Sequence, residues 1–407
     1  MHRFVRYILL LVFLPLCVLT NAQNNTSSPF SCFGLGDVND NVPNSYRAMG
    51  SVGIGMRNNR VICPSQPASF TACDSLTFMF DLAANVMWTR YGDDVGKKNK
   101  ANGNLDYIML QLPLYKRWVA LSAGLLPFTS VGYNMTLRDS IKSTYHYDAT
   151  YYGNGGVSEV YGGLSINLFD WVAIGATVYY MFGDVVNTRS VTFDEAGLTS
   201  VVQASELSVS SVRFREGIQF FHTFGKHTVT LGAIFENKQT LRSDFTVAES
   251  TQLDTVWVAK NVAEIPMMFG VGASYTWDKR LTVGFDFSRS YWEKAYNIQN
   301  YDLGNLRNRN KYAFGLEYRH NPIGRNYAER MFWRIGCNVS DAYVKAITSP
   351  DYMVSIGMGF PLRNARTVFN ASIEYGHRGP AGSLQEHYLR LTINAAIAET
   401  WFFKRKL

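Results

Sequence analysis

The chain has 407 residues, of which 17% are charged and 14% aromatic, and it contains 33 glycines. Typical soluble domains carry about 25% charged residues, so this composition argues against a charge-rich soluble helical protein and excludes a disordered or collagen-like chain. The sequence has one uninterrupted apolar run, at the extreme N-terminus, which also excludes a helical membrane protein. Low charge with abundant Tyr and Gly favours β-structure in surroundings other than water.

The first 22 residues have the features of a secretory signal peptide. Arg3 and Arg6 form a positive start, residues 8–19 are apolar, and Thr20-Asn21-Ala22 offers small residues for cleavage after Ala22. We therefore expect an exported protein. Loss of the two arginines lowers the net charge from +7 to about +5. The remaining basic residues form no stripe, so we expect no nucleic-acid partner.

Four cysteines remain after this cleavage: Cys32, Cys63, Cys73 and Cys337. An exported chain meets an oxidising compartment, and an even number of cysteines permits disulfides. Cys63 and Cys73 would close a short loop and are the preferred pair, although four free thiols remain an equal alternative. No Cys/His spacing matches a zinc site, so we expect neither a metal nor a cofactor.

From about residue 76 onward, apolar and polar residues alternate. Tyr352, Val354, Ile356, Met358 and Phe360 are separated by small or polar residues, apart from Met353, and runs near 76–88, 281–287 and 312–318 repeat the pattern. A period of two places the bulky apolar side chains on one face of a strand. The other face receives mainly Gly, Ser, Thr and charged residues.

These runs extend for about 10 to 15 residues, which suits a tilted membrane strand better than a globular strand of about 5 to 6 residues. A closed barrel is the β-arrangement that satisfies every backbone group in lipid. The sequence therefore predicts an all-β fold, a transmembrane antiparallel β-barrel of about 14 strands, in the outer membrane of a Gram-negative bacterium. The predicted strands are 76–91, 104–118, 119–138, 156–168, 171–183, 205–224, 227–247, 255–276, 280–296, 311–320, 331–345, 351–361, 366–377 and 386–403.

Turns and aromatic residues add to this topology. Short turns at Phe169-Asp170 and Gly225-Lys226 are typical of periplasmic hairpin ends, and longer polar inserts are typical of extracellular loops. The predicted loops are 92–103, 184–204 and 297–310. Aromatic girdles are expected at the lipid–water boundaries. The candidate pairs are Trp88/Tyr91, Trp118/Tyr115, Tyr291/Trp292 and Trp401/Phe402.

Residues 23–75 do not alternate, and they are rich in Asn, Ser, Gly and Pro. One interpretation is a periplasmic tail. The other is an N-terminal plug or hatch, which the small residues from Ala48 to Gly55 favour because they allow close backbone packing. Side chains alone fill a barrel of only about 8 strands, so a larger barrel needs further material in its lumen. The expected organisation is signal peptide 1–22, hatch 23–75 and barrel 76–407.

Three short motifs in this segment are Arg47-Ala48-Met49-Gly50, Gly53-Ile54-Gly55 and Gln66-Pro67-Ala68-Ser69. With the barrel pattern, they resemble the long-chain fatty-acid transporter (FadL-like) family, which has a signal peptide, a hatch with an Asn-Pro-Ala motif and a 14-stranded barrel. The terminal segment 401–407 is similar to the closing strand of divergent members. The resemblance implies that Gln66, Pro67, Ala68 and Ser69 form a gate. Gln66 departs from the family, which has Asn there, and Gln is a poorer helix cap.

Catalytic motifs are missing from the sequence. The six histidines after the signal peptide lack a linked serine or acid, and Gly153-Asn154-Gly155-Gly156 is a turn signal with no helix after it, so no enzyme is expected. Six charged residues fall on the polar faces of predicted strands and would line the lumen. They either bond to one another and to the hatch or line a polar path. These residues are Asp81, Asp286, Glu317, Arg319, Glu374 and Arg390.

The resemblance implies passive uptake of hydrophobic small molecules, with fatty-acid-like ligands, hatch gating and lateral exit into lipid. Gly124 and Pro127 could bend a strand and open such an exit. FadL-like relatives also imply an alternative, a non-transporting accessory barrel in an outer-membrane protein secretion or β-barrel assembly complex. Its partners would be outer-membrane lipid and other outer-membrane or periplasmic subunits. The altered motif at Gln66 favours this alternative.

Overall fold

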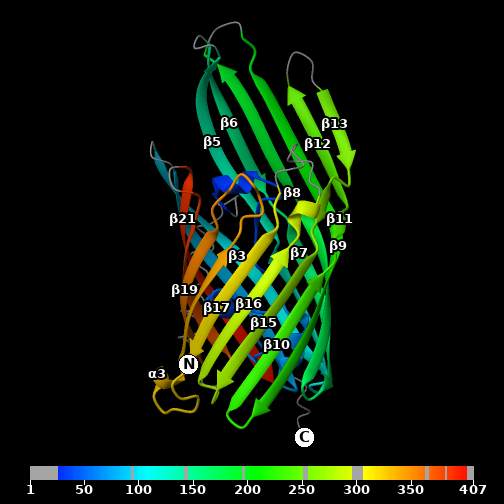
Figure 1. The fold of residues 1–407 in the computed structure, drawn as a ribbon, viewed down its shortest axis with the longest axis vertical. Coiled ribbons are helices and arrows are strands. Elements are labelled where there is room, and N and C mark those ends of the chain that lie inside the picture. Colours follow the sequence, from blue (N-terminus) through cyan, green and yellow to red (C-terminus); the bar gives the residue numbers. More distant parts are fainter. Residues whose placement is uncertain are drawn as a thin grey trace, which may run out of the picture.

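A computed structural model describes residues 26–92, 96–141, 145–194, 198–250, 255–295, 306–362, 366–380 and 383–400. The predicted signal peptide and residues 401–407 lie outside the described residues. Most of the described chain forms one large antiparallel sheet, which closes on itself (Figure 1).

Fourteen strands form the closed ring, because β2 pairs with β3 on one edge and with β21 on the other. The count and the fold class agree with the sequence prediction. In order around the ring, the strands are β2 (Thr77–Gly92), β3 (Lys97–Tyr115), β4 (Val119–Pro127), β7 (Ser158–Phe169), β8 (Val172–Phe193), β9 (Val201–Phe224), β10 (His227–Glu236), β15 (Met268–Trp277), β16 (Leu281–Ser290), β17 (Arg309–Tyr318), β18 (Phe332–Ser340), β19 (Asp351–Pro361), β20 (Val368–Arg378) and β21 (Gln385–Thr400).

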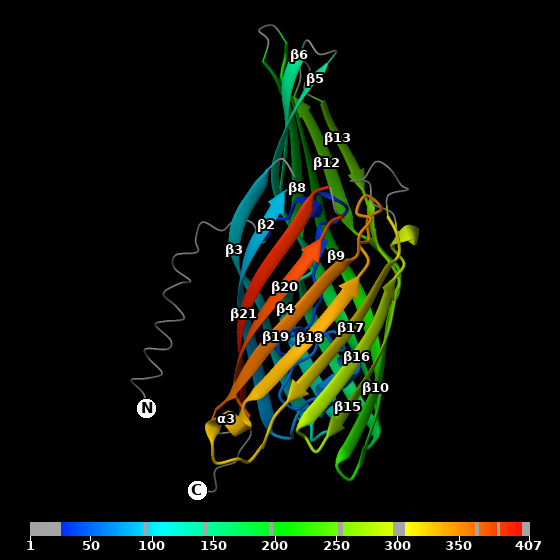
Figure 2. The same cartoon turned by 60° about the vertical axis from the view of Figure 1, so that its left-hand side comes forward.

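Two hairpins lengthen one side of the barrel beyond its rim. β5 (Thr129–Ile141) and β6 (Tyr145–Gly155) add to the far half of β8, while β12 (Ser243–Ser250) and β13 (Thr255–Lys260) add to the far half of β9. This extension stands at the top of Figures 1 and 2. The short turns lie at the opposite end, which is the periplasmic end in barrels of this type.

The remaining elements are short. β1 (Asp37–Val38) pairs with the start of β5, and β11 (Gln239–Leu241) pairs with β14 (Ala263–Ile265). The helices are η1 (Pro29–Cys32), α2 (Asn44–Arg47), η2 (Pro67–Ala72), η3 (Trp292–Lys294) and α3 (Tyr327–Arg330). Within the described ranges, no helix combines the length and the hydropathy needed to cross a membrane.

The alternation of the sequence becomes an inner and an outer face. In β19, Tyr352, Val354 and Ile356 are each at least half exposed on the outside, whereas Met353 and Ser355 are buried inside. A belt of exposed Leu, Ile, Val and Phe side chains on the outside of a closed barrel is the surface that lipid covers. The protein is therefore an outer-membrane-type β-barrel.

Several predicted boundaries were wrong. The run 119–138 is two strands, because the chain leaves the ring after Pro127 and β4 pairs directly with β7. The predicted loops 92–103 and 184–204 are largely strand, since β3, β8 and β9 continue past the ring into the rim and the extension. Part of the third predicted loop, 297–310, lies outside the described residues.

The aromatic pairs divide between the two faces. Tyr115, Trp118 and Trp88 are exposed on the outside, in agreement with the prediction. Tyr91 is buried, because an odd-numbered position on β2 points inward. Trp292 is also buried, in a cluster where its ring lies 4.7 Å from that of Tyr343. These two residues therefore belong to the interior and not to a girdle.

Candidate functional site: the lumenal segment and its polar surroundings

Residues 26–75, here called the lumenal segment, run inside the barrel, where the blue ribbon is visible behind the strands in Figures 1 and 2. Most of their side chains are buried. Tyr46, Met49 and Val52 pack with Ala313 of β17 in one apolar cluster. The small residues of this stretch permit the close approach that the sequence suggested: a Cβ on Gly55 would lie 2.4 Å from the backbone nitrogen of Ala273.

Asp286 of β16 holds the centre of the lumenal segment. Its carboxylate accepts hydrogen bonds from the backbone N–H groups of Gly53, Ile54 and Gly55, at 2.5, 2.7 and 3.1 Å. Hydrogen bonds to a charged acceptor are stronger than those between neutral groups. The sequence placed Asp286 on the lumenal face, and the structure shows that its carboxylate there accepts hydrogen bonds from the backbone of the lumenal segment.

Arg47 of α2 ties the segment to two other parts of the wall. Its guanidinium lies 2.7 Å from Asp106 of β3 and 3.7 Å from Glu374 of β20. Glu374 in turn lies 3.6 Å from Arg390 of β21. All four side chains are buried or half-buried, so the pairing compensates charges that would be costly alone.

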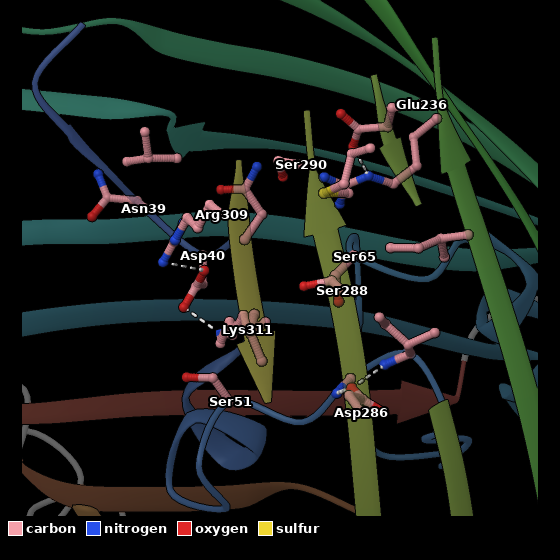
Figure 3. Close-up of a pocket in the computed structure, with 18 of the residues that line it drawn as sticks. Asn39, Asp40, Ser51, Ser65, Glu236, Asp286, Ser288, Ser290, Arg309 and Lys311 are labelled. Atoms are coloured by element: carbon pink, nitrogen blue, oxygen red, sulfur yellow. Dashed lines mark hydrogen bonds and ion pairs between the residues drawn. The ribbon is translucent and has the colours of Figure 1, made fainter. Parts of the chain in front are cut away.

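Asp40 faces a small cavity between the lumenal segment and the wall, which both charged and apolar side chains line (Figure 3). Its carboxylate lies 2.5 Å from Lys311 and 3.8 Å from Arg309 of β17. Burial by itself would raise the pKa of Asp40, but these two cations outweigh burial and lower the pKa to about 2. Asp40 is therefore ionised at any physiological pH.

A second buried network was missed by the sequence analysis. Arg213 of β9 bonds to Glu159 of β7 at 2.7 Å and to Glu236 of β10 at 2.9 Å, and Arg215 pairs with the same Glu236. Glu159 also accepts a hydrogen bond from Asn41 of the lumenal segment. The available signal was strand parity, because the apolar neighbours Val212 and Phe214 point outward and so require the arginines to point inward.

The predicted gate residues lie against the wall at β8, β9 and β10. Gln66 accepts a hydrogen bond from the Ala68 N–H and so caps η2, which corrects the expectation that Gln is a poor substitute here. The longer side chain also allows its amide to donate to the carbonyl oxygens of Ile54, Ile218 and Ala233. Nearby, Ser69 donates its hydroxyl to the Gln66 carbonyl.

Pro67 and Ala68 press on the inside of the wall. A Cβ on Gly175 would lie 2.5 Å from the Pro67 carbonyl carbon, and a Cβ on Gly217 would lie 2.0 Å from the Gln66 amide oxygen. Ser165 donates to the Ala68 carbonyl oxygen at 3.1 Å. Glycines in the strands therefore make room for this part of the lumenal segment.

The other predicted lumenal residues lie away from these contacts. Asp81 is buried and accepts a hydrogen bond from Asn394 at 2.7 Å, and Glu317 pairs with Arg334 at 2.7 Å. Arg319 follows the end of β17 instead of lying on a strand, and its guanidinium donates to the Lys279 carbonyl oxygen. The structure thus brings Asp286 and Glu374 into direct contact with the lumenal segment, whereas Asp81 is linked to it through Asn394, which also accepts a hydrogen bond from Asn44.

Cys63 and Cys73 are free thiols, so the preferred disulfide is not formed. The two residues pack into separate apolar clusters, one around Tyr46 and the other around Phe70. Cys63 instead lies 3.0 Å from the Ser65 hydroxyl. The chain between the cysteines is directed along the wall by Gln66 and η2, which separates the thiols despite the short loop.

The two larger of the cavities that border the lumenal segment have volumes of about 120 and 110 Å³. Charged side chains line both, including Asp40 and Arg309. Binding pockets for drug-sized ligands are larger, on the order of 300 to 1,000 Å³, and mostly apolar. No group of three or more His, Cys, Asp or Glu within the described residues could hold a metal ion. The arrangement can hold the lumenal segment in place and accommodate a few water molecules.

The fold and this interior define a class: transmembrane β-barrels of the outer membrane whose lumen contains an N-terminal segment of the same chain. The model of the BamG family matches residues 4–407, and the chain belongs to that family. None of the curated proteins matches the sequence.

Solved structures confirm the FadL-like architecture. The Ralstonia pickettii toluene transporter TbuX superposes with a TM-score of 0.61 at 14% identity, covering 89% of this chain and 99% of that one. The Pseudomonas putida toluene transporter TodX gives 0.60 at 13% identity, with 92% and 100% covered. A Pseudomonas aeruginosa FadL homologue gives 0.61 at 12% identity, with 91% and 100% covered. At these identities the likeness establishes the fold.

Proposed function

We propose that this chain is a non-transporting β-barrel subunit of a larger outer-membrane complex, in which the outside of the barrel is the working surface. The observation that carries this proposal is the fixation of the lumenal segment. Asp286, Arg47 and Asp40 connect the segment to β16, β3, β20 and β17 through buried charged contacts. Such contacts suit a packed interior more than a path that must open with every passing molecule.

The chemistry of the lumen supports the same proposal. A hydrophobic substrate gains free energy where it leaves water for apolar surroundings. Parts of the lumen instead present paired charges, those of Arg213, Glu159 and Glu236 and those of Arg47 and Glu374. An apolar molecule among these groups would separate them from their partners or from water, which is costly.

The family match leaves room for a role distinct from hydrocarbon transport. The BamG model matches nearly the whole chain, whereas the likeness to the toluene transporters is a likeness of fold at 13 to 14% identity. A fold by itself does not carry a function, because one architecture can serve several. The FadL-like barrel is here interpreted as a scaffold reused within an assembly.

Passive uptake of hydrophobic small molecules, with hatch gating and lateral exit, is the second candidate. It is favoured by the transporter architecture. It is also favoured by the contacts of Gln66, Pro67 and Ala68 with glycines of the wall, because a movement of the lumenal segment would displace the strands at these contacts. Pairing of β4 with β3 and with β7 includes Gly124, so an exit at this strand would require these ladders to separate.

A mild-detergent purification of the tagged full chain from its own outer membrane separates the two candidates. Proteins and extractable lipids in the eluate are identified together. Stoichiometric recovery of other outer-membrane subunits, with no hydrophobic cargo, is the expected result. A barrel that purifies alone and carries fatty-acid-like molecules would refute the assembly role. In that case, deleting residues 26–75 should change both uptake and conductance if this segment acts as a hatch.

A further inference from the structure

Glu216 of β9 points outward from the barrel, into the belt that lipid covers. Its neighbours along the strand on the same face are Phe214 and Ile218. Directly opposite it lie Ala176 of β8 and Phe235 of β10. These four residues are apolar, so the carboxyl group is surrounded by hydrocarbon within the wall.

The surrounding wall lacks any other such charge. Across the outward positions of 158–169, 172–182, 210–224, 227–236 and 268–277, all described, Glu216 is the only Asp, Glu, Lys or Arg. No hydrogen bond or ion pair joins it to another described residue. An unpaired acid on the lipid face of a barrel is unfavourable, and ionisable residues at membrane depth are usually functional.

The depth of Glu216 follows from the aromatic residues at the periplasmic end. Phe220 stacks on Trp171, with ring centroids 6.2 Å apart, and Trp171 stacks on Phe169 at 5.7 Å. Glu216 lies four residues above Phe220 on the same strand, which corresponds to about 10 Å along the membrane normal for a tilted strand. The lipid-covered band is about 25 Å tall, so Glu216 lies well inside it.

Glu216 also borders a groove in the outer wall. The groove has a volume of about 700 Å³ and crosses β7, β8, β9, β10 and β15, which are adjacent in the ring (Figure 1). Its small outward residues are Ala176 and Ala233, and Gly175 and Gly217 add backbone to it, because their missing side chains would face the lumen. Larger apolar side chains complete its lining, among them Leu164, Ile166, Phe235 and Phe269. Small residues at a membrane interface allow the backbones of two proteins to approach closely.

We propose that this groove binds a membrane-spanning segment of another protein, whose Lys or Arg side chain pairs with Glu216. The inference rests on the proposed function, since the partner is a subunit of the assembly. Charge complementarity selects the occupant: an acid without a donor among the described residues favours a cation from another molecule. The close-packing surface beside it suits a regular transmembrane strand or helix.

Two other occupants fit the site less well. Phospholipid ammonium groups reside at the lipid–water boundary, about 10 Å from Glu216 by the spacing above. A second copy of this chain meeting the same groove about a twofold axis would bring Glu216 near Glu216, and like charges in contact repel each other. Both remain measurable outcomes of the test.

The test places a photo-reactive amino acid at Ala233, in the groove, within the full chain in its native outer membrane. A matched control carries it at Ile373, an outward position on β20 that is 46% exposed. We expect an adduct from Ala233 with an outer-membrane protein and none from Ile373. Mass spectrometry should place the linked peptide in a membrane-spanning segment that contains Lys or Arg. Adding Glu216→Leu should abolish the adduct, whereas Glu216→Gln should weaken it.

Folding of each variant is verified by its heat-dependent migration on gels, which reports the closed barrel. An adduct whose yield is unchanged by Glu216→Leu would overturn the inference, as would an adduct with lipid alone or with a second copy. These outcomes are distinct from failure of the proposed function. If the wild-type protein co-purifies with other subunits but Ala233 labels only lipid, the assembly role stands and the groove proposal fails. If the wild-type protein purifies alone, the assembly role fails first.

Discussion

Replacement of Asp286 by Ala should release the centre of the lumenal segment. The carboxylate accepts three backbone hydrogen bonds, from Gly53, Ile54 and Gly55. Each hydrogen bond to a charged group contributes about 1.5 to 3 kcal/mol, and a simple sum overstates the loss because the bonds share one acceptor and water can replace part of it. We therefore expect the segment to be destabilised by about 3 kcal/mol, which raises its opening equilibrium roughly 100-fold.

The thiol of Cys63 provides the assay. Burial raises the pKa of Cys63 to about 11, so the thiol is protonated and shielded while the segment is in place. An opened segment exposes a thiol of ordinary pKa, which reacts as the thiolate. The other cysteines are replaced in the background C32S/C73S/C337S. The rate of maleimide labelling of Cys63 in the purified full-length barrel then reports opening of the lumenal segment. D286A should increase this rate roughly 100-fold.

The matched control is Glu236→Gln, which removes an interior carboxylate that pairs with Arg213 and Arg215 of the wall. It should leave the labelling rate of Cys63 close to that of the parent. If D286A labels no faster than the parent, or if Glu236→Gln accelerates labelling as much, then Asp286 does not specifically hold the segment. Asp286→Asn, which retains one acceptor oxygen, should give a labelling rate between those of the parent and D286A.

Three further results are expected. Arg47→Ala leaves Asp106 buried without its cation, so the barrel should lose about 3 to 5 kcal/mol in a gel-shift denaturation series, and Arg47→Lys should lose less. The pKa of Asp40 is lowered to about 2, so its contribution to stability is complete above the unfolded value near 4 and is lost as the pH falls toward 2; the barrel should therefore lose stability over that window in the denaturation series, and Asp40→Asn should remove this part of the acid response. Gly217→Ala should destabilise the barrel in the denaturation series, because its Cβ would lie 2.0 Å from the Gln66 amide oxygen; Gly162→Ala, whose Cβ meets nothing within 4 Å, should be neutral, and equal stability of the two variants would contradict the tight packing.

The alternation of residues determined the barrel. Tyr352, Val354 and Ile356 must share a face because successive strand residues point to opposite sides, and lipid is the environment that tolerates long apolar outer faces on a closed sheet. The same parity places Asp286 and Glu374 on the inner face from the sequence alone. The number of ring strands followed from counting such runs, because each run in an antiparallel barrel crosses the membrane once.

Strand ends were less predictable. Polar residues such as those at 97–103 and 184–193 look like loop when hydrogen bonding is ignored, yet they form strands of the rim and the extension because neighbouring hairpins satisfy their backbone groups. Pro127 marked a bend, but the departure of β5 from the ring depends on β7 taking its place beside β4. Such choices of partner are long-range and leave no local pattern.

Tertiary structure alone decided which charges meet. Arg47 and Glu374 are separated by more than 300 residues, and their contact exists because α2 lies beside β20 inside the barrel. Tertiary structure also separated Cys63 from Cys73 and made Gln66 a cap. Sequence by itself determined a lipid-covered barrel with a polar interior, since that requires only a period of two. The pairing of the interior groups, and the position of Glu216 on the outside with no partner in the described part of the chain, required the three-dimensional arrangement, because each depends on strands brought together by closure of the ring.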